Sequence, residues 1–420
     1  MGISTQTLGL TVGWLAVGWV ASQFAMFVVQ RIRRRIRWRG EYLRDRADFC
    51  RRVEATARAA RAAKSIPDWN GWRQFRVAVI VEESRDVKSF YFTPVDGRPL
   101  SPFAPGQYLT FRLPALDGAA PVVRCYSLSD RPREDFYRAT IKRVGAPSGG
   151  SGLPPGRGSS FFHDRVQVGD VVDVRAPAGT FLIDPRAKEP LVLIGAGIGI
   201  TPLVSMLESV VQARGQREVY ALFGFRSGSE HPFKTQLERL AQTNPQIHLH
   251  VSYSAPRDVD VLYKDFNHRG RLTIERIRQV LPSNNFPFYV CGPGPLMEAL
   301  VPALWKWGVP ESHVLFEAFG PASVKSISRS TQRAAETCEV RFERSGRRAM
   351  WDGSFASLLE FGESFGIAIP SGCRAGSCGE CMTAIRSGST LPLKQSAISV
   401  PSGHCLACIS VPAGPIVLEA

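Results

Sequence analysis

The hydrophobic and polar positions of the chain follow three different patterns in succession. An unbroken apolar run, LGLTVGWLAVGWVASQFAMFVV, covers residues 8–29. From Trp72 onward, short alternating segments such as RQFRVAVIVEES are separated by turns rich in Gly and Pro, such as DGRP. From Glu189 onward, apolar strand patterns (PLVLIGAG, EVYALFGF, HLHVSYSA, FPFYVCG, HVLFEAFG) alternate with helical ones (TPLVSMLESVVQA, HPFKTQLERLAQ, TIERIRQVLP). These changes of period divide the chain into domains.

Each pattern predicts a different architecture. Short strands with frequent turns predict an antiparallel β-barrel over residues 69–187. Strands alternating with helices predict an α/β domain with a parallel sheet over 188–322. After a linker at 323–335, CEVRFERSGRRAMW predicts a hairpin and FASLLEFGESFG a helix within a third domain over 336–420. We therefore expect a multidomain protein, as its 420 residues also suggest.

The first apolar run predicts a transmembrane helix. At 1.5 Å per residue it would span roughly 33 Å, enough for a hydrocarbon core of about 30 Å. Positive charge follows the run, as RIRRRIRWR, whereas a signal peptide carries it before the run. We expect a single-pass anchor at 1–30 in the inner (cytoplasmic) membrane, with the N-terminus outside and the other domains in the cytoplasm. A buried hairpin or core helix is the alternative.

The net charge of +15 is concentrated in one block. Between Arg31 and Lys64, 13 Lys or Arg and 4 Asp or Glu give +9, which leaves +6 for the rest of the chain. We therefore do not infer nucleic-acid binding, because no basic and aromatic strip follows downstream. Residues 31–68 are expected to form a basic helical linker that lies near anionic lipid; a plain solvated helix fits equally well.

Five of the nine cysteines lie in the last fifty residues. Their spacing, C-x4-C-x2-C and then 26 residues to Cys408, is the plant-type pattern for a [2Fe–2S] cluster. Zinc sites more often show two short C-x2-C pairs, and an odd number of clustered cysteines disfavours a disulfide framework. The segment GHCLACIS offers both Cys405 and Cys408 as the last ligand.

Two glycine turns follow predicted strands of the α/β domain. These are GAGIG at 195–199 and CGPGP at 291–295. Neither has the GxGxxG spacing of the dinucleotide fingerprint, so each alone could be a tight loop. Ligands of parallel sheets bind at the carboxyl ends of the strands, and two glycine turns there would allow close approach of a dinucleotide.

Several motifs in one order resemble the ferredoxin–NADP reductase superfamily. RCYS at 124–127 and GRGS at 156–159 resemble its flavin motifs, and GAGIGITP at 195–202 and YVCGPGP at 289–295 its nicotinamide-dinucleotide motifs. The resemblance runs from Trp69 to Gly320 and is similar to the reductase half of flavohaemoglobins. The segment from Cys338 to Ala420 resembles a β-grasp ferredoxin domain. The domain order resembles that of phthalate dioxygenase reductase and phenylacetate oxygenase reductase.

The resemblance implies a role for each matching residue. Arg124 would pair a flavin phosphate, Tyr126 would stack on the isoalloxazine ring and Ser127 would bond near its reactive nitrogen. Further flavin contacts would come from Lys142, Gly156 and Ser159. The dinucleotide would be bound by Gly195, Gly197, Gly199, Thr201, Gly292 and Pro293, with Cys291 and Glu317 beside the nicotinamide ring. The catalytic residues would be Tyr126, Ser127, Cys291 and Glu317, and the iron ligands Cys373, Cys378, Cys381 and Cys408, which leaves Cys405 as an extra thiol or a substitute ligand.

These roles imply a flavoprotein oxidoreductase that carries electrons from NAD(P)H through a flavin to the cluster. The chain shows no haem or Rieske motif, so we expect a separate electron acceptor: an oxygenase, a desaturase or hydroxylase, a cytochrome or a ferredoxin, which the anchor would place at the membrane. FAD or FMN, and NADH or NADPH, both remain open. The alternatives are an input subunit like that of NADH–quinone reductases, which the domain order disfavours, and a redox sensor of low turnover.

Overall fold

The computed structural model describes residue 69 and residues 71–114, 122–145, 156–318 and 337–420, except 373, 375, 377, 378, 394, 395, 397 and 399. All of them belong to one compact unit, Ile66–Ala420. The expected anchor, the basic linker and the linker at 323–335 lie outside the described residues. Within the described ranges, no helix is long and apolar enough to cross a lipid bilayer.

The first domain is an antiparallel sheet, as its alternating pattern predicts. Its strands are β1 (Arg73–Ser84), β2 (Val87–Pro94), β3 (Tyr108–Leu113), β4 (Val122–Ser127), β5 (Tyr137–Lys142) and β6 (Val171–Ala178), in the order β4-β3-β6-β1-β2-β5. A bridge between Leu128 and Ala139 connects the chain just beyond β4 to β5, so the two edges of the sheet approach each other. Helix α2 (Arg157–Asp164) inserts Phe162 into the aromatic core, edge-on to the ring of Phe111.

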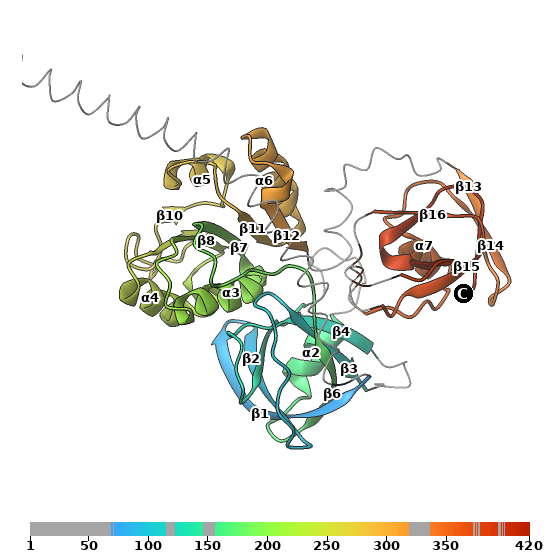
Figure 1. The fold of residues 1–420 in the computed structure, drawn as a ribbon, viewed down its shortest axis with the longest axis horizontal. Coiled ribbons are helices and arrows are strands. Elements are labelled where there is room, and N and C mark those ends of the chain that lie inside the picture. Colours follow the sequence, from blue (N-terminus) through green and yellow to red (C-terminus); the bar gives the residue numbers. More distant parts are fainter. Residues whose placement is uncertain are drawn as a thin grey trace, which may run out of the picture. The chain divides into compact units, whose positions relative to one another are not determined.

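The second domain is a parallel sheet in the order β10-β9-β8-β7-β11-β12. The strands are β7 (Leu191–Ala196), β8 (Val219–Phe225), β9 (Ile247–Tyr253), β10 (His268–Arg269), β11 (Phe288–Gly292) and β12 (Val314–Ala318). Leu191 and Leu193 pack with helices α3 (Ile200–Gln212) and α4 (Lys234–Thr243) on one face. Val192 and Ile194 pack with α5 (Ile274–Val280) and α6 (Gly294–Lys306) on the other (Figure 1).

The strand order of this second sheet reverses between β7 and β11. From β7 the chain adds β8, β9 and β10 on one side, and then returns to place β11 and β12 on the other. Such a switch point leaves a crevice at the carboxyl ends of the two central strands, which is where ligands bind in open α/β sheets. Both glycine turns follow the strands that flank this point.

The third domain is a mixed sheet in the order β14-β13-β19-β15-β17. Its strands are β13 (Cys338–Phe342), β14 (Arg347–Trp351), β15 (Met382–Ser387), β17 (His404–Leu406) and β19 (Ile416–Leu418), beside a ribbon of β16 (Thr390–Pro392) and β18 (Ser410–Pro412). The expected hairpin is β13–β14. The expected helix is α7 (Leu358–Ser364), which begins after Ser357 because that side chain caps the backbone N–H of Glu360.

Candidate functional site

The flavin motif of the barrel brings Arg124, Tyr126 and α2 together. A Cβ atom added to Gly158 would lie 2.7 Å from Cγ of Arg124 and 2.9 Å from the hydroxyl oxygen of Tyr126. Only glycine therefore lets the first turn of α2 approach these two side chains. Burial lowers the pKa of the Arg124 guanidinium, as expected of a cation that has lost part of its hydration and would gain from a bound anion.

The ring of Tyr126 packs against two aromatic rings of the barrel core. Its ring meets Phe162 edge-on, with centroids 5.4 Å apart, and lies 5.8 Å from the ring of Phe111. Burial raises the pKa of the Tyr126 hydroxyl, so the phenol stays neutral. A neutral, fixed aromatic ring at the end of β4 suits the expected stacking role.

Gly156 and Ser159 shape the entrance to α2. The Ser159 hydroxyl donates to the backbone oxygen of Gly156 at 3.1 Å and accepts from the N–H of Val144 at 3.1 Å. The N–H of Gly156 donates to the oxygen of Val144 at 2.9 Å. These bonds fasten the start of α2 to the chain that leaves β5, which fixes the site where the resemblance places flavin phosphates.

The strand register of the α/β domain aligns three predicted site residues. Gly195 on β7 is paired with Cys291 on β11, and Cys291 is paired with Glu317 on β12. All three lie at the carboxyl ends of their strands, beside the switch point. The sheet therefore gathers into one row three residues that together span 122 positions of the sequence, from Gly195 to Glu317.

The two glycine turns touch one another at this row. A Cβ atom on Gly199 would lie 2.5 Å from the backbone oxygen of Cys291 and 2.6 Å from Cα of Gly292. Gly197 has φ of +54°, a conformation that side chains disfavour. The Thr201 hydroxyl donates to the oxygen of Ile198 at 3.0 Å and closes the turn on the start of α3.

The second turn continues directly into helix α6. Pro293 is the residue before the helix, with an extended backbone, and Gly294 is its first residue. A Cβ atom on Gly292 would lie 2.7 Å from a methyl carbon of Leu296 and 3.3 Å from the backbone N of Ala196. The two turns therefore pack closely together at the starts of α3 and α6, and the unpaired backbone N–H groups of helix starts favour anionic groups.

The barrel and the α/β domain meet at the expected reaction site. The Ser127 hydroxyl donates to a carboxylate oxygen of Glu317 at 3.5 Å. Cys291 is fully buried, and its burial together with the charge of Glu317 raises the pKa of its thiol well above the usual range. Ser127, Cys291 and Glu317 thus form one group of a hydroxyl, a neutral thiol and a carboxyl.

Lys142, which is expected to contact the flavin, lies beside an acidic residue of the α/β domain. Its amino group lies 3.5 Å from a carboxylate oxygen of Glu230, in the turn after β8 of the α/β domain. Nearby, the N–H of Arg85 donates to the oxygen of Ser229 at 2.9 Å. Lys142 therefore contributes to the contact between the two domains.

Two of the four expected iron ligands are described, and they converge. The sulfur atoms of Cys381 and Cys408 lie 3.2 Å apart in the buried interior, and the N–H of Ala407 donates to the oxygen of Cys381 at 3.0 Å. Two thiols at this separation fit shared coordination of one iron. Cys373 and Cys378 lie outside the described residues, and among the described ones no group of three or more metal-ligating side chains assembles.

Cys405 lies beside the same group but on a strand. It pairs with Thr383 across β17 and β15 and is 3% exposed. Burial, with a contribution from Cys381, raises the pKa of the Cys405 thiol to about 12. Cys405 thus lies on a strand of the sheet, whereas Cys408 lies in the short helical turn that follows it, at Ala407–Ile409.

Comparison with known proteins supports all three domains. The family models that match are an oxidoreductase FAD-binding domain at residues 74–183, an oxidoreductase NAD-binding domain at 193–301 and a 2Fe-2S iron–sulfur cluster binding domain at 343–413. The FAD/NAD-binding domain of nitric oxide dioxygenase from Vibrio cholerae is 31% identical, with a TM-score of 0.53, over 60% of this chain and 100% of that one. The chain belongs to the ferredoxin–NADP reductase superfamily.

Other members of the superfamily match different lengths of the chain. Flavohemoproteins of Oceanobacillus iheyensis and Chromobacterium violaceum are 36% and 38% identical over 61% and 60% of this chain. The chain spans about three fifths of the length of these relatives. A phthalate dioxygenase reductase, whose structure is described as modular for electron transfer from pyridine nucleotides to [2Fe-2S], is 27% identical with a TM-score of 0.50. That match covers 83% of this chain and 98% of the other.

The sequence motifs contain many of the residues that the structure brings together, but two features were not predicted. Gly158 stands within the quoted GRGS motif, yet only the structure shows that it is the residue in contact with Arg124 and Tyr126. The acid that approaches Lys142 is Glu230, whose position in the turn after β8 gave no sequence signal. Both depend on which segments pack together, which local spacing does not encode.

Proposed function

We propose that this chain is an NAD(P)H-dependent reductase that passes electrons through FAD and a [2Fe–2S] cluster to a separate acceptor. The observation that carries the proposal is the meeting of Ser127, from the FAD-binding domain, with Glu317, which stands in register with Cys291 of the NAD-binding domain. A nicotinamide and a flavin ring bound by their respective motifs would face each other across this contact.

The protein residues would bind and orient the cofactors. Arg124 offers a guanidinium fork that suits phosphate oxygens. The touching turns around Gly199 would let a dinucleotide lie against bare backbone. The protonated thiol of Cys291 would border the nicotinamide without adding charge. When bound, FAD accepts a hydride as two electrons and releases electrons singly, which is how a two-electron donor can supply a one-electron cluster.

The proposal also covers the electron acceptor and the location of the protein in the cell. The domain order supports an oxygenase, a desaturase or hydroxylase, a cytochrome or a ferredoxin as the acceptor. The apolar run at 8–29 and the basic block behind it support attachment to the inner membrane by a single-pass anchor, with the cofactor domains in the cytoplasm. A membrane-bound acceptor is therefore favoured.

An anaerobic titration of the full-length holoprotein tests the electron path. NADH, and separately NADPH, is added stepwise while flavin and cluster absorbance are followed at their own wavelengths. We expect the flavin to bleach first and the cluster to follow, with one nucleotide acting faster. A flavin that bleaches while the cluster stays oxidised would contradict the internal path.

A deletion tests the anchor. Removal of residues 1–64 ends just before the compact unit that begins at Ile66. We expect the shortened protein to leave the membrane fraction, to reduce an artificial acceptor at the full rate and to reduce membrane-bound acceptors more slowly. Retention in the membrane fraction after the deletion would show that the anchor proposal is wrong.

A further inference from the structure

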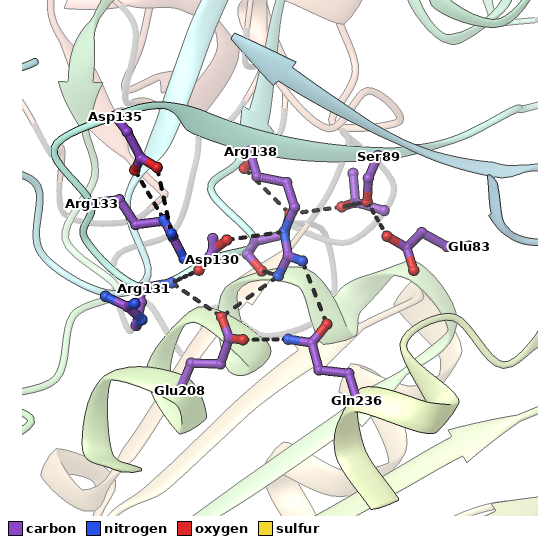
Figure 2. Close-up of polar contacts among 11 residues, drawn as sticks. Glu83, Ser89, Asp130, Arg131, Arg133, Asp135, Arg138, Glu208 and Gln236 are labelled. Carbon is purple, nitrogen blue, oxygen red and sulfur yellow. Dashed lines mark hydrogen bonds and ion pairs between the residues drawn. The ribbon is translucent and has the colours of Figure 1, made fainter. Parts of the chain in front are cut away.

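A buried arginine crosses the boundary between the FAD-binding and NAD-binding domains. Arg138 on β5 is only 6% exposed. On its own side, its guanidinium donates to the backbone oxygen of Ser129 and lies 3.8 Å from a carboxylate oxygen of Asp130. On the other side, it lies 3.6 Å from a carboxylate oxygen of Glu208 and donates to the side-chain oxygen of Gln236 at 3.5 Å (Figure 2).

The partners of Arg138 are themselves fixed from both domains. The carboxylate of Glu208 accepts the side-chain N–H of Gln236, and it also accepts the backbone N–H of Arg131 at 3.2 Å. The guanidinium of Arg138 stacks on the ring of Phe233, 5.0 Å from its centroid. We call Asp130, Arg138, Glu208 and Gln236 the interdomain cluster.

The interdomain cluster is connected to the reaction site by short, rigid segments. Asp130 follows Ser127 by three residues, and this segment is paired to β5 because the N–H of Ser129 donates to the oxygen of Arg138 at 2.9 Å. Glu208 lies on α3, the helix that begins immediately after the Gly197–Gly199 turn. Glu208 follows Ile200 by eight positions of this helix, a distance of about 12 Å along its axis.

A gain in the stability of the fold does not explain why the charges of Arg138 and Glu208 are buried. Burial, the charge of Asp130 and a side-chain hydrogen bond in which protonated Glu208 donates to Asp130 raise the pKa of Glu208 to about 7, and Arg138 opposes this rise only in part. Apolar residues of similar volume are often as stable as, or more stable than, a buried ion pair. The directional contacts of a guanidinium fork, by contrast, fix the relative placement of the groups that it joins.

We propose that Arg138 is a positioning residue for hydride transfer, which sets the nicotinamide turn against the flavin serine by joining Asp130 to Glu208 and Gln236. This inference rests on the proposed reductase function. Because reacting atoms must meet at near-contact distance, a misplacement of about 1 Å can slow a reaction on the order of 100-fold. Loss of the interdomain cluster should therefore slow hydride transfer without loss of either cofactor.

Arg138→Met tests the role, because it keeps much of the apolar stem and removes the fork. The control is Asp135→Asn, which removes the charge of the exposed pair with Arg133 on the same loop; Figure 2 draws no contact from Asp135 to the NAD-binding domain. Anaerobic stopped-flow measurement on the full-length holoproteins, with whichever of NADH and NADPH reduces the wild type faster, gives the limiting rate of flavin reduction and the nucleotide dissociation constant separately.

We expect Arg138→Met to lower the limiting rate about tenfold or more. The nucleotide dissociation constant should stay within about threefold and the flavin content and midpoint potential should be unchanged, while Asp135→Asn matches the wild type. A limiting rate within about threefold of wild type, or a loss confined to nucleotide or flavin binding, would overturn the positioning role. If the wild type is reduced by neither nucleotide, the proposed function fails first, and this role fails with it.

If Arg138→Met does not fold, Glu208→Gln tests the positioning role of Arg138 instead. It keeps the size of the side chain and removes the charge that faces Arg138. The charged groups around Glu208 are Asp130, Arg133 and Arg138, so the ion pair with Arg138 forms as Glu208 loses its proton. The limiting rate of the wild type should rise severalfold through pH 7, and that of Glu208→Gln should stay low and flat. Parallel pH profiles would overturn the role.

Discussion

The contact between the two glycine turns predicts that Gly199→Ala separates them. The added Cβ would lie 2.5 Å from the backbone oxygen of Cys291, whereas ordinary contact begins at 3.4 Å. The turn and the end of β11 must therefore move apart by about 0.9 Å, because both partners are backbone atoms, and such overpacking costs about 1–3 kcal/mol.

The displacement falls where the dinucleotide is proposed to bind. A shift of nearly 1 Å should slow flavin reduction by NADH or NADPH by about 10- to 100-fold. Flavin and cluster content should stay at wild-type levels, because neither cofactor is expected to touch the α3 turn. The assay is anaerobic stopped-flow reduction, with flavin and iron quantified in the same preparations.

Gly215→Ala is the matched control. It lies just beyond the other end of α3, and the nearest atom to its added Cβ is the backbone N of Arg217 at 3.9 Å. Its reduction rate should equal that of the wild type. If Gly199→Ala also reduces at the wild-type rate, the turns do not form the dinucleotide surface and the reasoning from close backbone approach is refuted.

Three further predictions concern the flavin motif, the iron–sulfur cluster and the stability of the fold. Gly158→Val should push aside Arg124 and Tyr126 and lower the ratio of bound FAD to protein severalfold, read from absorbance after gel filtration; an unchanged ratio would contradict the flavin assignment. Cys408→Ser should abolish the visible and EPR signals of the cluster and Cys405→Ser should keep them, whereas the reverse result would reassign the fourth ligand. The pKa of Glu208 is raised from 4.5 to about 7 in the folded protein. The free energy of unfolding should therefore fall by up to about 3 kcal/mol as the pH rises between these values. Thermal melting should therefore show Glu208→Gln equal to wild type at pH 4.5 and more stable at pH 8, and coincident curves at pH 8 would contradict the raised pKa.

The sequence predicted the antiparallel sheet, the parallel sheet and the ferredoxin-type domain because their signals are local, whereas the roles of the site residues stay predictions. Alternation predicted the antiparallel barrel, each glycine turn lies within five residues, and three of the four expected iron ligands lie within nine. What it could not predict are contacts between elements that are far apart in the chain. Arg138 and Glu208 are separated by 70 positions, and neither stands in a motif. Their meeting depends on how the barrel packs against α3, which no local pattern specifies. The anchor at 1–30 stays a prediction.

The interdomain cluster has a consequence for recombination between related reductases. Asp130 and Arg138 belong to the barrel, Glu208 and Gln236 to the α/β domain, and the natural crossover point between the domains lies between β6 and β7. A chimera joined there inherits half of the interdomain cluster from each parent. Grafting all four side chains from a single parent should restore electron flow in chimeras that fold and load both cofactors yet turn over slowly.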